Sequence, residues 1–180
     1  MNRFAKLLEK LLFTPSRNAK IIAMAEYFEN TPDPDRGFAL GAITRDLSLN
    51  NLKPTQLRML TKTRVDPELF DMSYDYVGDM AETISLIWPK HTNHVLEKQR
   101  LPQLGELVSA LQTKSKIALQ TYVTELLDCA SVTERWAIIK MVTGGLRVGV
   151  SARLAKTSLA EYSGKDLTEI EKIWHGIAVP

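Results

Sequence analysis

The sequence predicts an all-α fold, and three observations support this expectation. Apolar residues recur at helical spacing, as Leu7, Leu8 and Leu11 do near the N-terminus. Proline follows a polar residue at several expected helix starts, for example at Lys53-Pro54 and Asp66-Pro67. No segment alternates apolar and polar residues between hairpin turns, as strands of an antiparallel sheet would.

The individual helices follow from their capping residues and their apolar faces. Thr14 is expected to cap the second helix with Pro15 in its first turn, and Ser73 to cap a helix that Pro89 stops. The polar stretch Lys90 to Arg100 is the expected internal boundary. Five further helices are expected at about residues 102–112, 114–128, 132–142, 150–162 and 166–177.

A weak internal repeat appears when the chain is compared with itself at a shift of 99 residues. The matching pairs are Leu8 and Leu107, Leu12 and Leu111, Thr14 and Thr113, Ser16 and Ser115, Arg17 and Lys116, and Arg36 and Arg135. We therefore expect one domain, residues 1–180, built from two pseudo-symmetric helical halves at about 1–90 and 101–180.

Composition excludes several classes of protein. No apolar run approaches the ~20 residues of a membrane span, and the charged N-terminus does not resemble a signal peptide. The single cysteine, Cys129, permits no internal disulfide and favours a cytoplasmic location. His91 and His94 lack further ligands at suitable spacing, so no metal site is expected. The net charge of +2 is mild, and a nucleic-acid site would need basic residues gathered locally.

Two helix starts are the first candidate site. The segments TPSR, Thr14 to Arg17, and TKSK, Thr113 to Lys116, place hydroxyls and basic side chains where a helix N-terminus offers unpaired N–H groups. Plain capping is the alternative interpretation. Basic residues in a first helical turn oppose the helix dipole, which favours a bound anion such as phosphate, and both starts are expected to face one surface of the molecule.

The glycine-rich segment TGGLRVGVSAR, Thr143 to Arg153, is the second candidate site. Its glycines would let the backbone approach a ligand closely, and Arg147 stands between two of them. In the alternative interpretation the segment only links two helices, Gly144 ends the first of them, and the arginines are solvated.

Other polar and aromatic residues have structural interpretations. The basic helix within Leu49 to Arg64 could widen a DNA footprint or be solvated. Asp33 and Asp35 are expected to make local hydrogen bonds in a turn. The three tryptophans, Trp88, Trp136 and Trp174, are expected in the core.

Three segments resemble ATP-dependent DNA ligases. GGLRVGVSARLAKTSLAEY, Gly144 to Tyr162, resembles the Gly-x-Leu-Arg-(Ile/Leu/Val)-Gly signature of their N-terminal DNA-binding domain. YDYVGDMAETISLIWP, Tyr74 to Pro89, is similar to a helix of the bacterial members, and TKSKIALQTYVTELL, Thr113 to Leu127, resembles a helix start upstream of the signature. The resemblance extends from the first helix to Trp174.

The resemblance implies an all-helical domain that lies on the minor groove of nicked duplex DNA and holds phosphates on both sides. It implies a monomer of the cytoplasm or nucleoid that binds no membrane. The DNA-binding residues expected from the two candidate sites and the resemblance are Thr14, Ser16, Arg17, Thr113, Lys114, Ser115, Lys116, Gly144, Gly145, Leu146, Arg147, Gly149, Ser151 and Arg153.

The chain departs from the family at the catalytic lysine of Lys-x-Asp-Gly. Lys165-Asp166-Leu167 is the nearest match and lacks the spacing and the glycine. We therefore expect no catalytic residue and no cofactor here. The chain is expected to be an excised or truncated N-terminal domain without the adenylation and OB-fold domains of its parent, which would use ATP and Mg²⁺. The rival interpretation is a helical scaffold for protein–protein contacts.

Overall fold

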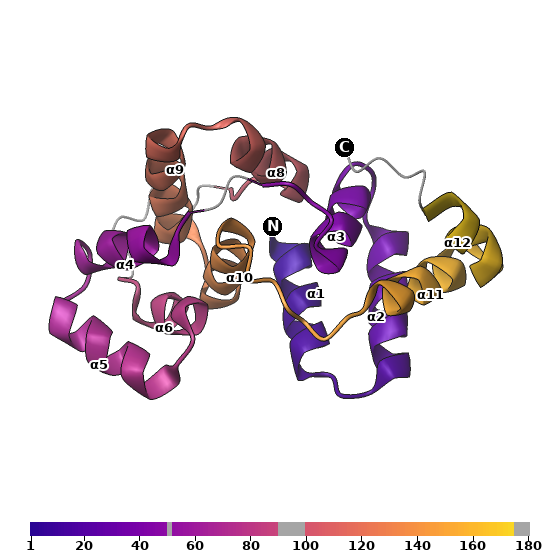
Figure 1. The fold of residues 1–180 in the computed structure, drawn as a ribbon, viewed down its shortest axis with the longest axis horizontal. Coiled ribbons are helices and arrows are strands. Elements are labelled where there is room, and N and C mark those ends of the chain that lie inside the picture. The colour runs from indigo at the N-terminus through magenta and orange to yellow at the C-terminus, as the bar shows by residue number, and fades with distance from the viewer. Residues whose placement is uncertain (50–51, 90–99, 175–180) are drawn as a thin grey trace.

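The computed structural model describes residues 1–49, 52–89 and 100–174, and the all-α expectation is confirmed over these residues. Figure 1 shows the helices. They are α1 (Asn2–Phe13), α2 (Arg17–Asn30), α3 (Asp35–Thr44), α4 (Pro54–Lys62), α5 (Pro67–Val77), α6 (Met80–Ile87), α8 (Leu104–Thr113), α9 (Lys116–Cys129), α10 (Val132–Val142), α11 (Ala152–Ser163) and α12 (Leu167–Trp174).

Side-chain caps explain where most helices begin, and they correct two expected starts. Ser16, not Thr14, caps α2, because its hydroxyl accepts a hydrogen bond from the N–H of Ala19 at 3.3 Å. Ser73 lies inside α5, which ends at Gly78 with a left-handed φ of 77°. Asp79 then caps α6. The segment Tyr74 to Pro89 therefore contains the end of α5 and all of α6, because a glycine in a left-handed conformation ends α5.

The helices form two groups that mix residues from both sequence halves. In Figure 1 the right-hand group contains α1, α2, α3, α11 and α12, and the left-hand group contains α4, α5, α6, α9 and α10. The most extensive helix pairs are α2 with α11, α6 with α10 and α1 with α10. A continuous apolar core, including Phe4, Phe28, Leu107 and Ile138, joins them. Helices far apart in the chain thus stabilise each other by burying apolar surface.

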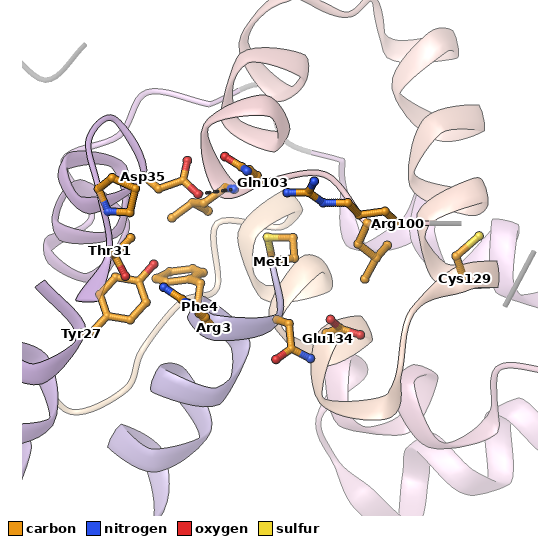
Figure 2. Close-up of a pocket in the computed structure, with 14 residues that line it drawn as sticks. Met1, Arg3, Phe4, Tyr27, Thr31, Asp35, Arg100, Gln103, Cys129 and Glu134 are labelled. Atoms are coloured by element: carbon orange, nitrogen blue, oxygen red, sulfur yellow. Dashed lines mark hydrogen bonds between the residues drawn. The ribbon is translucent and has the colours of Figure 1, made fainter. Parts of the chain in front are cut away.

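Asp35 joins the two halves of the chain, whereas a local hydrogen bond within its turn was expected. Its carboxylate accepts hydrogen bonds from the N–H groups of Leu104 at 3.1 Å and Gly105 at 2.8 Å, so it caps α8 from about 70 residues away. Figure 2 shows this contact at the edge of a cavity that Met1 and Tyr27 also line. Burial raises the pKa of Tyr27 to about 12.

Candidate nucleic-acid interface

The loop between α10 and α11, residues 143–151, will be called the glycine loop. Gly144 has a left-handed φ of 69°, and its N–H donates to the carbonyl of Met141 at 3.2 Å. The N–H of Gly145 donates to the carbonyl of Lys140 at 3.0 Å. The expected role of Gly144 as the end of a helix is therefore confirmed, and neither amide is available to a ligand.

Side chains alternate along the glycine loop between the core and the surface. Leu146 is 4% exposed and Val148 is 3% exposed, whereas Arg147 and Gly149 are exposed. The side chain of Leu146 therefore fills the core, so only the backbone of this residue could contact DNA, and its expected DNA contact stays a prediction. Its burial and that of Val148 anchor the loop and direct Arg147 outward.

The backbone of this loop carries a run of N–H groups that have no acceptor among the described residues. Over the described part of the chain, no hydrogen bond is donated by the backbone N–H groups of residues 146–151. Ser151, at the end of the loop, caps α11 by accepting from the N–H of Leu154 at 3.2 Å. Its hydroxyl proton remains able to donate. Unpaired amides in a row are suited to an anion.

The glycine loop also presents cations. The side chains of Arg147 and Arg153 are exposed, and within the described ranges neither forms an ion pair or a side-chain hydrogen bond. Free guanidinium groups beside free amides favour a polyanion as the ligand.

The two helix starts expected from the repeat are built alike. In each, the capping residue lies two residues later than expected. Ser16 caps α2 and Ser115 caps α9, each accepting from the N–H three residues on, at 3.3 and 3.4 Å. Thr14 instead follows the end of α1, and Thr113 is the last residue of α8. Capping by Thr14 and Thr113 was expected and is wrong, because the serines two residues later cap these helices. Each serine still has a hydroxyl proton to donate.

Basic residues follow both caps. Arg17 and Lys116 are the first helical residues of α2 and α9; both are exposed, and neither has an ion-pair partner among the described residues. Lys114 is half-buried, with its ammonium 4.9 Å from the centre of the Tyr122 ring. A cation in the first turn opposes the helix dipole, so these two positions gain stability when an anion is present.

Tertiary packing brings the start of α2 to the glycine loop. Lys20, one turn into α2, donates hydrogen bonds to the carbonyls of Val148 and Gly149 at 2.9 and 3.1 Å. The start of α9 lies elsewhere. Figure 1 places the α8–α9 turn at the upper edge of the molecule and the α1–α2 turn at the lower edge. A ligand that contacted both helix starts would have to extend across the molecule.

A second loop matches the glycine loop and was missed by the sequence analysis. Arg45, which ends α3, has a left-handed φ of 66°, and its N–H donates to the carbonyl of Ala42. The N–H of Asp46 donates to the carbonyl of Gly41. These bonds repeat those of Gly144 and Gly145 at the same shift of 99 residues. The sequence carried no signal for this loop, because an arginine occupies the position where glycine is usual.

The basic helix within Leu49 to Arg64 is not a free cationic surface. Arg58 and Lys62 both pair with Asp71, and Arg64 pairs with Asp128. Two carboxylates from other elements thus pair with three cations and offset part of their charge, so this helix offers less free positive charge than its sequence suggests. Lys53, at the start of α4, is exposed and has no such partner within the described ranges.

The remaining expectations concern metals, tryptophans and the membrane. His91 and His94 lie outside the described residues, and the residues that the structure describes contain no group of three or more His, Cys, Asp or Glu side chains that could hold a metal. Trp88 is buried as expected, whereas Trp136 and Trp174 are half-buried. None of the helices in the described ranges has the length and apolar character of a membrane span.

Comparison with known proteins shows the family. A search of curated proteins gave no match. A family model described as DNA ligase N terminus matches residues 1–160, which include both helix starts and the glycine loop. Because this match covers most of the chain, the protein belongs to the family of N-terminal domains of ATP-dependent DNA ligases.

Proposed function

We propose that this domain binds nicked duplex DNA through its phosphates and minor groove, without reading the base sequence. The observation that carries the proposal is the glycine loop, where unpaired N–H groups of residues 146–151 lie beside the free guanidinium of Arg147. Amides and arginines bind phosphate oxygens, which are the same at every step of a duplex. Membership of a DNA ligase family makes DNA the expected polyanion.

The arrangement of the contacts supports an extended ligand. One set contains the glycine loop, Arg153 and the start of α2, which Lys20 joins to the loop. The shift of 99 residues assigns the start of α9 and the loop that begins at Arg45 to a second set. The common shift of 99 residues relates the two sets, as expected for two pseudo-symmetric halves. Two equivalent sets would hold the two strands that border a minor groove.

We infer that this domain positions DNA and takes no part in nucleotide transfer. Lys165, the nearest candidate for an adenylated lysine, is exposed and pairs with Glu169 at 3.8 Å. Asp166 receives the N–H of Thr168. ATP, Mg²⁺ and the ligation chemistry would therefore belong to other parts of a parent ligase. Covalent adenylate on this chain after incubation with radiolabelled ATP would contradict this inference.

A salt titration of duplex binding tests the proposal. Fluorescence anisotropy with labelled nicked and intact duplexes should give an affinity that falls linearly with salt on log–log axes. Arg147→Ala should flatten that slope by about 0.9, the contribution of one phosphate contact, equally on duplexes of unrelated sequence. Arg58→Ala is the matched control, because its side chain is paired with Asp71 and should leave the slope unchanged. An unchanged slope with Arg147→Ala would remove the glycine loop from the interface.

The rival function, a scaffold for protein contacts, has one supporting observation. Leu12, Phe13, Leu86 and Val132 are exposed around a groove between α1, α6 and α10, and Phe13 is 77% exposed. An apolar groove of this kind would bind a protein with little dependence on salt. Phe13→Ser should leave duplex affinity unchanged if DNA is the ligand of the domain. If Phe13→Ser weakened duplex binding more than Arg147→Ala does, the apolar groove and not the glycine loop would be the main binding surface of the domain.

A further inference from the structure

Lys20 has an unusual environment for a lysine. It is 9% exposed, and its ammonium donates to two consecutive backbone carbonyls of the glycine loop, those of Val148 and Gly149. No carboxylate lies within ion-pair distance of Lys20 among the described residues. Burying a cation without a counter-ion costs free energy, which two carbonyl dipoles offset only in part.

The fold itself does not require a cation at this position of the helix. Leu119 stands at the matching position of α9, 99 residues later, and is fully buried. An apolar side chain therefore fills the equivalent place in the second half at no desolvation cost. The ammonium of Lys20 must serve the loop that it contacts rather than the packing of α2.

The peptide geometry shows what the contact does to the loop. In the described chain the only cis peptide bond is Asp33-Pro34, so the bonds that follow Val148 and Gly149 are trans. In a trans peptide the C=O and the next residue's N–H point in opposite directions. When Lys20 holds both carbonyls inward, the N–H groups of Gly149 and Val150 must point away from it, toward the outside of the loop.

Gly149 is adapted to the same contact. Its φ is +65°, and a Cβ built there would lie 2.7 Å from the ammonium of Lys20. The missing side chain of Gly149 therefore leaves room for the lysine on the inner side of the loop. Gly149 was expected to let a ligand approach closely, but the group that approaches it on its inner side is the ammonium of Lys20.

We propose that Lys20 is a positioning residue, which orients the amides of Gly149 and Val150 toward a DNA phosphate without touching DNA. Two consecutive N–H groups that point the same way form an anion-binding pair. This inference rests on the proposed function, because it assigns those amides a phosphate. It also predicts that the glycine loop is ordered in the free protein, which can be measured without DNA.

Limited proteolysis tests the order of the loop. Trypsin cleaves after Arg147, and the Arg147–Val148 bond is protected while Val148 stays buried and its carbonyl is held. Lys20→Met should speed this cleavage by roughly tenfold, because local opening becomes easier. Lys6→Met removes the same charge from an exposed site on α1 and is the matched control. An unchanged cleavage rate in Lys20→Met would overturn the proposal.

Duplex binding distinguishes positioning from direct contact. Lys20→Met should weaken binding roughly tenfold through the lost amide contacts. The log–log salt slope should stay constant, because amides release no counterions. A slope that falls by about 0.9 would show that Lys20 itself neutralises a phosphate, and would overturn the proposal. An unchanged affinity would overturn it as well.

A second variant keeps the test decisive if Lys20→Met does not fold. Gly149→Ala places a Cβ against the same ammonium, should displace it from the loop carbonyls and should reproduce the faster cleavage. If both single variants fold, the double variant should lose no more affinity than the more damaging single one, and additive losses would contradict a shared contact. If the unaltered chain does not bind duplex, the proposed function fails, and cleavage alone then shows whether Lys20 orders the loop.

Discussion

Arg45 and Gly144, 99 residues apart, end their helices in the same way. Both have a left-handed φ, 66° and 69°, and each donates its N–H to the carbonyl three residues earlier. The next residue in each case donates to the carbonyl five residues before it. Glycine adopts this conformation without strain, whereas arginine does so at a cost of about 1 kcal/mol. The first half of the chain therefore carries a strained arginine where the second carries a glycine.

Replacing Arg45 by glycine should stabilise the protein and weaken its function. Removing the left-handed strain should raise the melting temperature by roughly 2–4 °C. Loss of an exposed cation next to the DNA should flatten the log–log salt slope of duplex binding by about 0.9. Calorimetry and anisotropy on the same sample measure both effects. A higher melting temperature with unchanged DNA binding would remove the second loop from the interface.

Gly145 and Gly149 should respond differently to alanine. A Cβ at Gly145 would meet Thr143 Oγ1 at 3.4 Å and Lys140 Cδ at 3.8 Å, which are ordinary contacts. Gly145→Ala should therefore leave the melting temperature within about 2 °C of the unaltered protein and reduce duplex affinity by blocking close approach. Gly149→Ala should lower both, because its φ is left-handed and the Cβ collides with Lys20. Equal melting temperatures for the two variants would contradict this distinction.

Charge reversal at Arg17 and at Lys116 tests whether both helix starts contact DNA. Arg17→Glu and Lys116→Glu should each weaken duplex binding about tenfold or more, because an attraction to phosphate becomes a repulsion. Neither should lower the melting temperature, since a carboxylate in the first helical turn interacts favourably with the helix dipole. If one reversal abolishes binding and the other has no effect, the two-sided footprint is wrong.

Asp79 should make stability depend on pH in acid. Burial alone would raise the pKa of its carboxyl, but hydrogen bonds from Lys140 and from the N–H of Glu82 outweigh burial, and the pKa lies below its usual value. A lowered pKa in the folded state contributes stability above the unfolded value of about 4, and this contribution is lost as pH falls through the folded pKa.

Asp79→Asn isolates that contribution, because asparagine keeps the helix cap and loses the charge. The variant should be less stable than the unaltered protein by roughly 1 kcal/mol or less at neutral pH. The difference in melting temperature should shrink as pH falls below about 4 and disappear below the lowered pKa of Asp79 in the folded protein. Calorimetry over this range measures it, and a difference that persisted at the lowest pH would assign the effect to the cap and not to the ion pair with Lys140.

Features that depend on residues close together in the chain could be predicted from the sequence alone. Apolar spacing along α1 and α10 predicted helices there, and the caps and glycines predicted the ends, to within a few residues. Gly144 could be assigned to a helix end because the bonds of a helix terminus join residues only three to five apart. The repeat at a shift of 99 residues was likewise found from matching residues such as Ser16 and Ser115.

Which polar groups remain available to a ligand depends instead on how the helices pack in three dimensions. Arg58 and Arg147 look alike in sequence, but Asp71 pairs with Arg58, and no described residue pairs with Arg147. Lys20 reads as one more surface cation, and packing of α2 against α11 buries it beneath a loop 128 residues away. Such partners are chosen by how helices pack through their apolar faces, and the ion pairs and backbone contacts follow from that packing. No local pattern in the chain records these long-range distances, which is why the sequence could suggest a candidate interface but could not show which of its cations and amides lack a partner among the described residues.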